Sequence, residues 1–139
     1  MEKIKVLWVS RHEPLPCQKQ FLEERLGKPV EFIVHAGHVP NAEYVASIAE
    51  KLGVQYVLPV LPLSFIARLV ELAAQKGFTV LWSKMEPIAT TASSEAAQKI
   101  VEQNPDCRTA VTYSDGTTRV YEFRTIEKIK AVKVETEPL

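Results

Sequence analysis

The chain has 139 residues, of which 46% are hydrophobic and 24% charged, and this predicts one globular domain with a sizeable core. Lysine and arginine together number 17, as do aspartate and glutamate, so the formal net charge is zero and no broad basic surface is expected to bind duplex nucleic acid. The apolar runs are far shorter than the roughly 20 residues that span a bilayer, and the first residues contain no signal-peptide core. We therefore expect a soluble cytoplasmic protein without a membrane partner.

The first half of the chain alternates apolar strands with amphipathic helices. The apolar run Ile4–Val9 predicts a strand covered on both faces, and Gln18–Leu26 predicts a helix that the next residue, a glycine, ends. A second strand is expected at residues 30–34. The next helix is expected to begin at the N-cap Asn41 and to end at Gly53.

The same alternation continues through two further strands. We expect a strand at residues 54–60, a helix capped by Ser64 and ended by Gly77, and a strand at residues 78–82. Residues 83–94 are predominantly polar and predict a loop. Four strand–helix units in series favour a three-layer, Rossmann-like α/β fold with a mostly parallel sheet.

The C-terminal part has a different pattern. A short helix is expected at residues 95–103, and the dipeptide Asp115-Gly116 between two β-rich runs predicts an antiparallel hairpin. Residues 126–134 are interpreted as a further strand. We therefore divide the single domain into an α/β core at residues 1–105 and a β-hairpin extension at residues 106–139, which we expect to contribute to a homodimer.

The two cysteines, Cys17 and Cys107, lie far apart in the sequence and in no metal-type spacing. Disulfides are rare in cytoplasmic proteins, and a pair of this kind is more often two reduced thiols. We expect both thiols to be reduced.

Polar and charged side chains follow the expected strands at their carboxyl ends, where open parallel sheets bind ligands. The candidate ligand-binding residues are Ser10, Arg11, His12, His35, His38, Lys84 and Glu86. The first turn of the helix after the third strand adds the backbone amides of Leu63, Ser64 and Phe65, which a helix N-terminus would direct at an anion. The chain contains no glycine-rich dinucleotide or P-loop motif and no GxSxG nucleophile motif.

The histidines leave a metal hydrolase open as an alternative. His35 and His38, joined by His12, would supply the three imidazoles of a zinc site. No cluster of acidic ligands accompanies them, so our prediction contains neither metal nor cofactor.

Three segments in this order carry a resemblance to a known family: VSRHEPL at residues 9–15, PVLPLSFIARL at 59–69 and FTVLWSKMEP at 78–87. They resemble the small Rossmann-like, CARF-like accessory proteins of type III CRISPR antiviral defence systems, which include ring nucleases. In that group a strand ending in Ser/Thr-Arg-His-Pro is followed by a turn into a helix. Here Glu13 stands between His12 and the proline.

The resemblance implies binding of cyclic oligoadenylate across a homodimer, and metal-independent cleavage by 2′-hydroxyl attack that leaves a 2′,3′-cyclic phosphate. His12 would be the general acid or base and Arg11 would stabilise the phosphoryl oxygens. Lys84 and the backbone amides would hold phosphates, and Ser10 or Ser64 would contact a ribose or phosphate oxygen. The alternative from a different class is a non-catalytic module that binds or sequesters the nucleotide.

Overall fold

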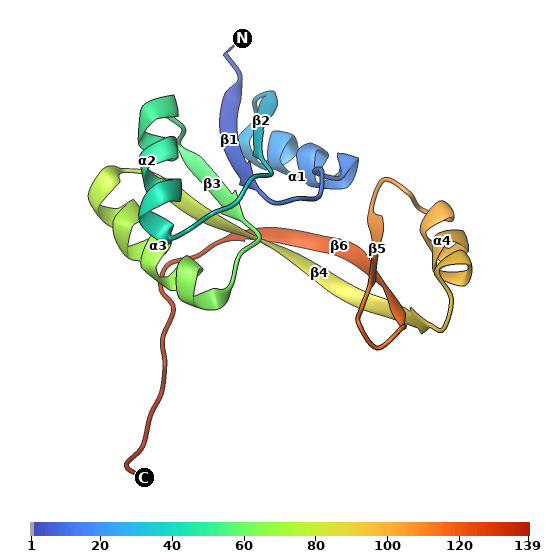
Figure 1. The fold of residues 1–139 in the computed structure, drawn as a ribbon. Helices are drawn as coiled ribbons and strands as arrows, with labels where there is room; N and C mark the ends of the chain where they lie inside the picture. The colour runs from blue at the N-terminus through green and yellow to red at the C-terminus, as the bar shows by residue number, and fades with distance from the viewer. Residues whose placement is uncertain (1) are drawn as a thin grey trace. The chain divides into compact units, whose positions relative to one another are not determined.

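The computed structural model describes residues 2–139 and shows an α/β fold (Figure 1). Within this range six strands form one mixed sheet in the order β2-β1-β3-β4-β6-β5, accompanied by four helices. The elements are β1 (Ile4–Val9), α1 (Pro16–Leu26), β2 (Val30–His35), α2 (Ala42–Leu52), β3 (Tyr56–Pro59), α3 (Leu63–Lys76), β4 (Thr79–Thr91), α4 (Ser94–Glu102), β5 (Arg108–Thr112) and β6 (Thr118–Lys128).

The described chain divides into two compact units. The first contains residues 2–13, 28–82 and 127–139, and the second contains residues 14–27 and 83–126. The helices α1 and α4 thus belong to the same unit as the hairpin β5–β6, and this division does not follow the sequence boundary between residues 105 and 106.

The first unit is built on parallel strands. β1 pairs with β2 on one side and with β3 on the other, and Val9 is in register with both His35 and Pro59. Because the three strands run in one direction and end in register, their carboxyl ends meet at one edge. The helices α2 and α3 lie side by side (Figure 1). They contribute Val45 and Leu69 to the buried core of this unit.

The two helices of this unit begin differently from one another. The Oδ1 atom of Asn41 accepts a hydrogen bond from the backbone N–H of Tyr44 at 2.9 Å, which confirms the expected N-cap of α2. The expected cap at Ser64 is wrong, because Pro62 is the N-cap and Ser64 is the second residue of α3. The proline ring restricts φ to −55° at the point where the chain enters the helix, so the helix begins earlier than a capping side chain would place it.

The expected loop at residues 83–94 is also wrong, because β4 continues through these residues to Thr91. Residues 83–91 have little local strand preference, but β6 is the neighbour of β4 in the sheet and satisfies its backbone. The expected last strand at 126–134 is only the end of β6, which stops at Lys128. Beyond it, the N–H of Ile129 donates to the carbonyl of Val80 at 2.9 Å.

The hairpin of the second unit is confirmed, with β5 and β6 antiparallel around Asp115 and Gly116. Gly116 has φ of 86°, a value that only glycine adopts without strain. The side chain of Asp115 accepts hydrogen bonds from the N–H of Thr117 at 2.9 Å and from its hydroxyl at 2.6 Å. The turn is therefore defined by the two residues that predicted it.

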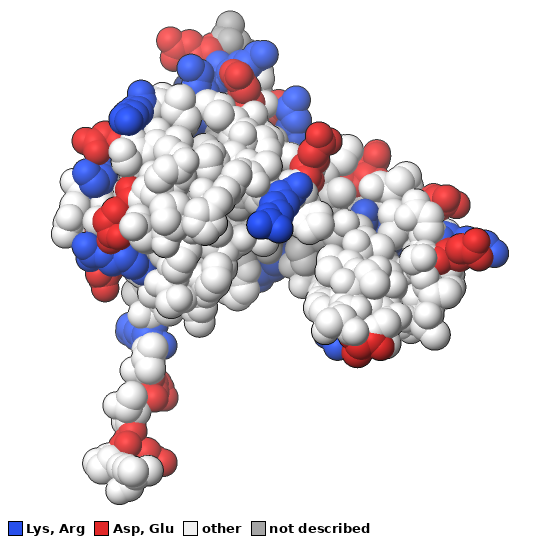
Figure 2. All heavy atoms as spheres, in the orientation of Figure 1, with Lys and Arg blue, Asp and Glu red and all other residues white. Residues whose placement is uncertain are grey.

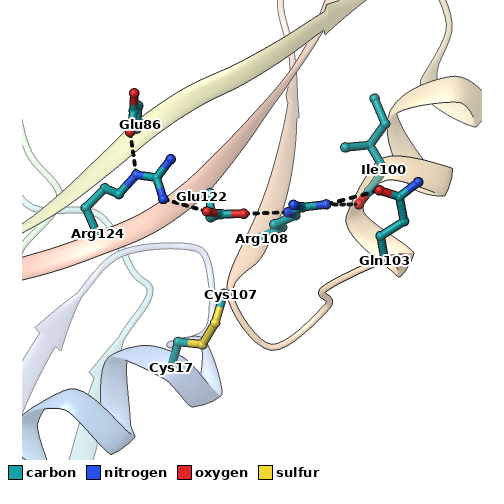
Figure 3. Close-up of polar contacts among 8 residues, drawn as sticks. All are labelled: Cys17, Glu86, Ile100, Gln103, Cys107, Arg108, Glu122 and Arg124. Carbon is teal, nitrogen blue, oxygen red and sulfur yellow. Dashed lines mark hydrogen bonds and ion pairs between the residues drawn. A yellow bond between two sulfur atoms is a disulfide. The ribbon is translucent and has the colours of Figure 1, made fainter.

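The two cysteines form a disulfide within the second unit, so the expectation of reduced thiols is wrong (Figure 3). Cys17 is the second residue of α1, and its N–H donates to the carbonyl of Asp106 at 3.1 Å, beside Cys107. In the same unit α1 also contacts β6, where the rings of Phe21 and Phe123 meet edge to face at 5.6 Å between centroids. The two cysteines are 90 residues apart in the sequence, so local patterns could not predict that the fold brings them together.

A chain of ion pairs runs through the same unit (Figure 3). Arg108 donates through Nε to Glu122 at 2.7 Å and through a terminal nitrogen to the carbonyl of Ile100 at 2.9 Å. Arg124 bonds Glu122 at 2.6 Å and also bonds Glu86. The side chains of Arg108 and Glu122 are 19% and 17% exposed, so this pair is better shielded from water than the pair Arg124–Glu86.

The Glu122 carboxylate is expected to make the stability of the protein depend on pH. Its hydrogen bond with Arg108, helped by the charges of Arg108 and Arg124, lowers the pKa of Glu122 below its ordinary value. Its contribution is therefore present above the unfolded-state pKa and is lost as the pH falls through the lower folded-state pKa.

We expect Glu122→Gln to destabilise the protein near pH 7 and to have a progressively smaller effect toward about pH 3. Denaturant titrations of both proteins across this range measure the difference. Glu102→Gln, at an exposed position on α4, is the control and should show little effect at any pH. A Glu122→Gln effect that stays constant from neutral to acid pH would contradict the prediction.

None of the helices in residues 2–139 has the length and apolar character needed to cross a bilayer. On the face drawn in Figure 2, Lys and Arg side chains are interspersed with Asp and Glu side chains. This face therefore has no broad basic region, in agreement with the zero net charge of the chain.

Candidate functional site

A pocket of about 460 Å³ lies in the first unit, at the carboxyl ends of β1, β2 and β3. Three loop segments contribute to it, one after each strand. The lining residues are Val9, Ser10, Arg11, His12, His35, Ala36, Gly37, His38, Val39, Val60, Leu61, Pro62 and Phe65. The location is the one at which parallel sheets generally bind ligands, because the strand ends leave their loops free to carry function.

The segment after β1 is held in place through the backbone of His12. The hydroxyl of Ser10 accepts a hydrogen bond from the His12 N–H at 3.1 Å, and the indole Nε1 of Trp8 donates to the His12 carbonyl at 2.6 Å. Both anchoring side chains are buried, whereas those of Arg11 and His12 are exposed. The fold therefore presents Arg11 and His12 from a fixed backbone.

The segment after β2 contributes two histidines in different environments. His38 is exposed, whereas His35 is partly buried and its ring lies 5.5 Å from the ring of Tyr44. The Nε2 atom of His35 is buried and has no hydrogen-bond partner within the described chain. Gly37 lies close to it, since a Cβ on Gly37 would be 3.6 Å from this nitrogen.

The electrostatic character of the pocket follows from what lines it. Arg11 forms no ion pair with any residue in the range 2–139, and its neighbour Glu13 is not among the lining residues. No aspartate or glutamate of the described chain lines the pocket. A guanidinium without a carboxylate partner leaves the pocket suited to an anion.

The structure brings together only some of the residues that the sequence indicated. Ser10, Arg11, His12, His35, His38 and Phe65 line the pocket. Leu63 and Ser64 are exposed and do not line it. Lys84 and Glu86 are strand residues of β4 in the second unit, and Glu86 pairs there with Arg124. The expectation for Lys84 and Glu86 assumed that β4 ends at residue 82.

The sequence interpretation missed the apolar part of the lining and the role of one tryptophan. Val39, Val60, Leu61 and Pro62 follow strand ends just as the polar candidates do, and that position was the signal that could have identified them. Trp8 was not among the candidate site residues. It is 3% exposed, yet its indole N–H also anchors the His12 loop.

A metal centre finds no support in this geometry. Among residues 2–139 no three histidine, cysteine, aspartate or glutamate side chains are arranged to hold a metal ion. His12, His35 and His38 share the pocket without forming such a group.

A second pocket, of about 450 Å³, lies at the other end of the same strands, near Ile4 and Gln55. Lys3, Lys5 and Lys28 line it together with Glu2. It is less suited to specific binding, because a lysine ammonium cannot form the paired, parallel hydrogen bonds that an arginine guanidinium forms with an anion. Ligand sites of parallel sheets also form at the carboxyl ends of the strands, not at this end. Its lysines serve as controls for the first pocket.

Comparison of the chain with protein-family models, with curated proteins and with solved structures gave no match. The function is therefore inferred from the pocket itself and from the resemblance in sequence.

Proposed function

We propose that the chain binds a phosphorylated nucleotide in the pocket at the carboxyl ends of β1, β2 and β3. The observation that carries the proposal is Arg11, an arginine without an ion-pair partner in a pocket that no carboxylate of residues 2–139 lines. His12, which follows β1, and His38, which follows the neighbouring strand β2, add exposed imidazoles. Arginine binds a phosphate with two parallel hydrogen bonds, which a free guanidinium can supply.

The more specific form of the proposal is a metal-independent ring nuclease that acts on cyclic oligoadenylate in antiviral defence. It is supported by the resemblance of VSRHEPL and PVLPLSFIARL, the segments that contribute Arg11, His12 and Phe65 to the pocket. The Rossmann-like, three-layer arrangement and the homodimer belong to this proposal. A symmetric ring fits a two-fold interface, where each subunit presents the same residues.

The proposed reaction needs no group beyond the chain and the ring. A ribose 2′-oxygen attacks the adjacent phosphorus, the bond from phosphorus to the 5′-oxygen breaks, and a 2′,3′-cyclic phosphate remains. His12 accepts the 2′-hydroxyl proton as general base and, as general acid, delivers it to the leaving 5′-oxygen. Arg11 stabilises the charge that develops on the phosphoryl oxygens. Ser10 and Trp8, which hydrogen-bond the backbone of His12, hold His12 in position during the reaction.

Substitution of Arg11 tests the binding step. We expect Arg11→Ala to weaken binding of cyclic tetra- and hexa-adenylate about tenfold to a hundredfold, as loss of a charged hydrogen bond does. Lys28→Ala, which removes a cation from the other pocket, is the control and should bind as the parent protein does. Equal affinity of the Arg11→Ala and Lys28→Ala proteins would refute the proposed site.

Substitution of His12 separates catalysis from binding. Each ring is incubated with protein in the presence of a chelator, and the products are identified by chromatography. We expect cleavage by the parent protein and a loss of about a hundredfold or more for His12→Ala, with little change in affinity. If the parent protein binds the rings tightly but leaves them intact, the nuclease proposal is wrong and the protein is a binding or sequestering module. The metal hydrolase is not proposed, because the histidines form no metal-binding group within residues 2–139.

A further inference from the structure

The pocket lacks the side chains that usually distinguish one nucleobase from another. Among residues 2–139, no asparagine, glutamine, aspartate or glutamate lines it. Side chains of this kind read a base because each presents donors or acceptors in a fixed arrangement. Arg11 can also bond O6 and N7 of guanine, but the proposed function assigns it to the phosphate. A base in this pocket therefore meets few groups that recognise its edge.

The polar side chains that are present do not replace them. Ser10 is 8% exposed, and its hydroxyl already accepts a hydrogen bond from the N–H of His12. The Nε2 atom of His35 is buried beside Gly37. His12 and His38 are exposed, but a neutral imidazole can present either a donor or an acceptor by changing tautomer. Such a group can hydrogen-bond the edge of either adenine or guanine.

Much of the remaining lining is apolar, and part of it comes from a different connection than the arginine does. Val60, Leu61, Pro62 and Phe65 come from the connection between β3 and α3, whereas Arg11 follows β1 and the histidine pair follows β2. Val60 is 56% exposed, so a flat ring placed there would cover apolar surface that is now in water. Every base has the same kind of apolar face, so contact of this kind is tolerant of base identity.

We infer that this pocket recognises a nucleotide by its phosphate and by the apolar face of its base, without distinguishing adenine from guanine. The inference rests on the proposed function and assigns Val60 and Phe65 as the contacts for the base. An apolar pocket discriminates weakly between ligands of similar shape, whereas a site built from fixed hydrogen-bonding groups rejects the wrong ligand strongly. The composition of the lining places this pocket in the first class.

Calorimetric titration of the full chain with adenosine 5′-monophosphate, guanosine 5′-monophosphate and ribose 5-phosphate tests the inference. We expect the two nucleotides to bind within tenfold of each other, and ribose 5-phosphate to bind about fivefold to a hundredfold more weakly because it lacks a base. Val60→Ala and Phe65→Ala should weaken nucleotide binding and leave ribose 5-phosphate unchanged. Leu63→Ala, an exposed position outside the lining, is the control.

Each outcome of the titration bears on a different claim. A ratio above tenfold between the two nucleotides would overturn the inference, and so would ribose 5-phosphate binding as tightly as they do. Either result would leave the phosphate site at Arg11 standing. Failure of all three compounds to bind would instead refute the proposed function, and the inference with it. Val60 provides a solvent-exposed test position should Phe65→Ala not fold.

Discussion

Loss of the Cys17–Cys107 disulfide is expected to lower the free energy of unfolding by about 4 to 5 kcal/mol. A cross-link restricts the unfolded chain, and its effect grows with the length of the loop that it closes. The separation of 90 residues puts this loop near the upper end of the entropic scale. Such an effect is comparable to the whole stability of many domains.

Denaturant unfolding of the oxidised protein, of the protein with a dithiol reductant, and of the Cys17→Ser/Cys107→Ser variant measures this effect. We expect the reduced protein and the variant to unfold at similar and much lower denaturant concentrations than the oxidised protein. The control is the variant measured with and without reductant, because the reductant should not change its unfolding. If the oxidised and reduced proteins unfold together, the disulfide contributes no stability and the prediction is wrong.

Leu69→Ala is expected to destabilise the first unit by about 3 to 5 kcal/mol. Leu69 on α3 is fully buried in the core with Leu7, Val45 and Val57. Removing its side chain loses apolar contacts and leaves a cavity that the surrounding strands and helix can close only in part.

The matched control lies on the same helix. Leu63 is 66% exposed at the first position of α3, and Leu63→Ala should change the free energy of unfolding by no more than about 0.5 kcal/mol. Thermal or denaturant unfolding of the two variants gives the comparison directly. Similar losses at Leu63 and Leu69 would show that α3 does not pack as the structure describes.

The disulfide also bears on where the protein functions. Disulfides persist in oxidising compartments and are uncommon in the cytoplasm of most organisms. The expectation of a cytoplasmic protein therefore loses the support that reduced thiols would have given it. Counting free thiols in the unfolded protein, isolated with its thiols trapped, would establish the redox state of Cys17 and Cys107 in the cell.

Local patterns in the sequence determined the elements whose signals are short-range. The run Ile4–Val9 predicted β1, Asn41 predicted the start of α2, and Asp115-Gly116 predicted the hairpin turn. The helix start and the turn depend on hydrogen bonding and backbone conformation within a few residues. The strand β1 was recognised instead by its continuous apolar run, which is typical of a strand covered on both faces. The same rule placed Arg11, His12 and His35 at one edge of the sheet, because parallel strands end together.

Tertiary structure decided what depends on segments that are far apart in the sequence. Residues 83–91 mix polar and apolar side chains without a clear strand pattern, and they form a strand because β6 lies beside them in the sheet. This moved Lys84 and Glu86 from a loop into a strand, where Glu86 pairs with Arg124. The Cys17–Cys107 disulfide likewise required α1 to meet the segment before β5. The sequence contains the groups that make these contacts. Which groups pair depends on the tertiary structure, because each partner is distant in the sequence and only folding brings the two together.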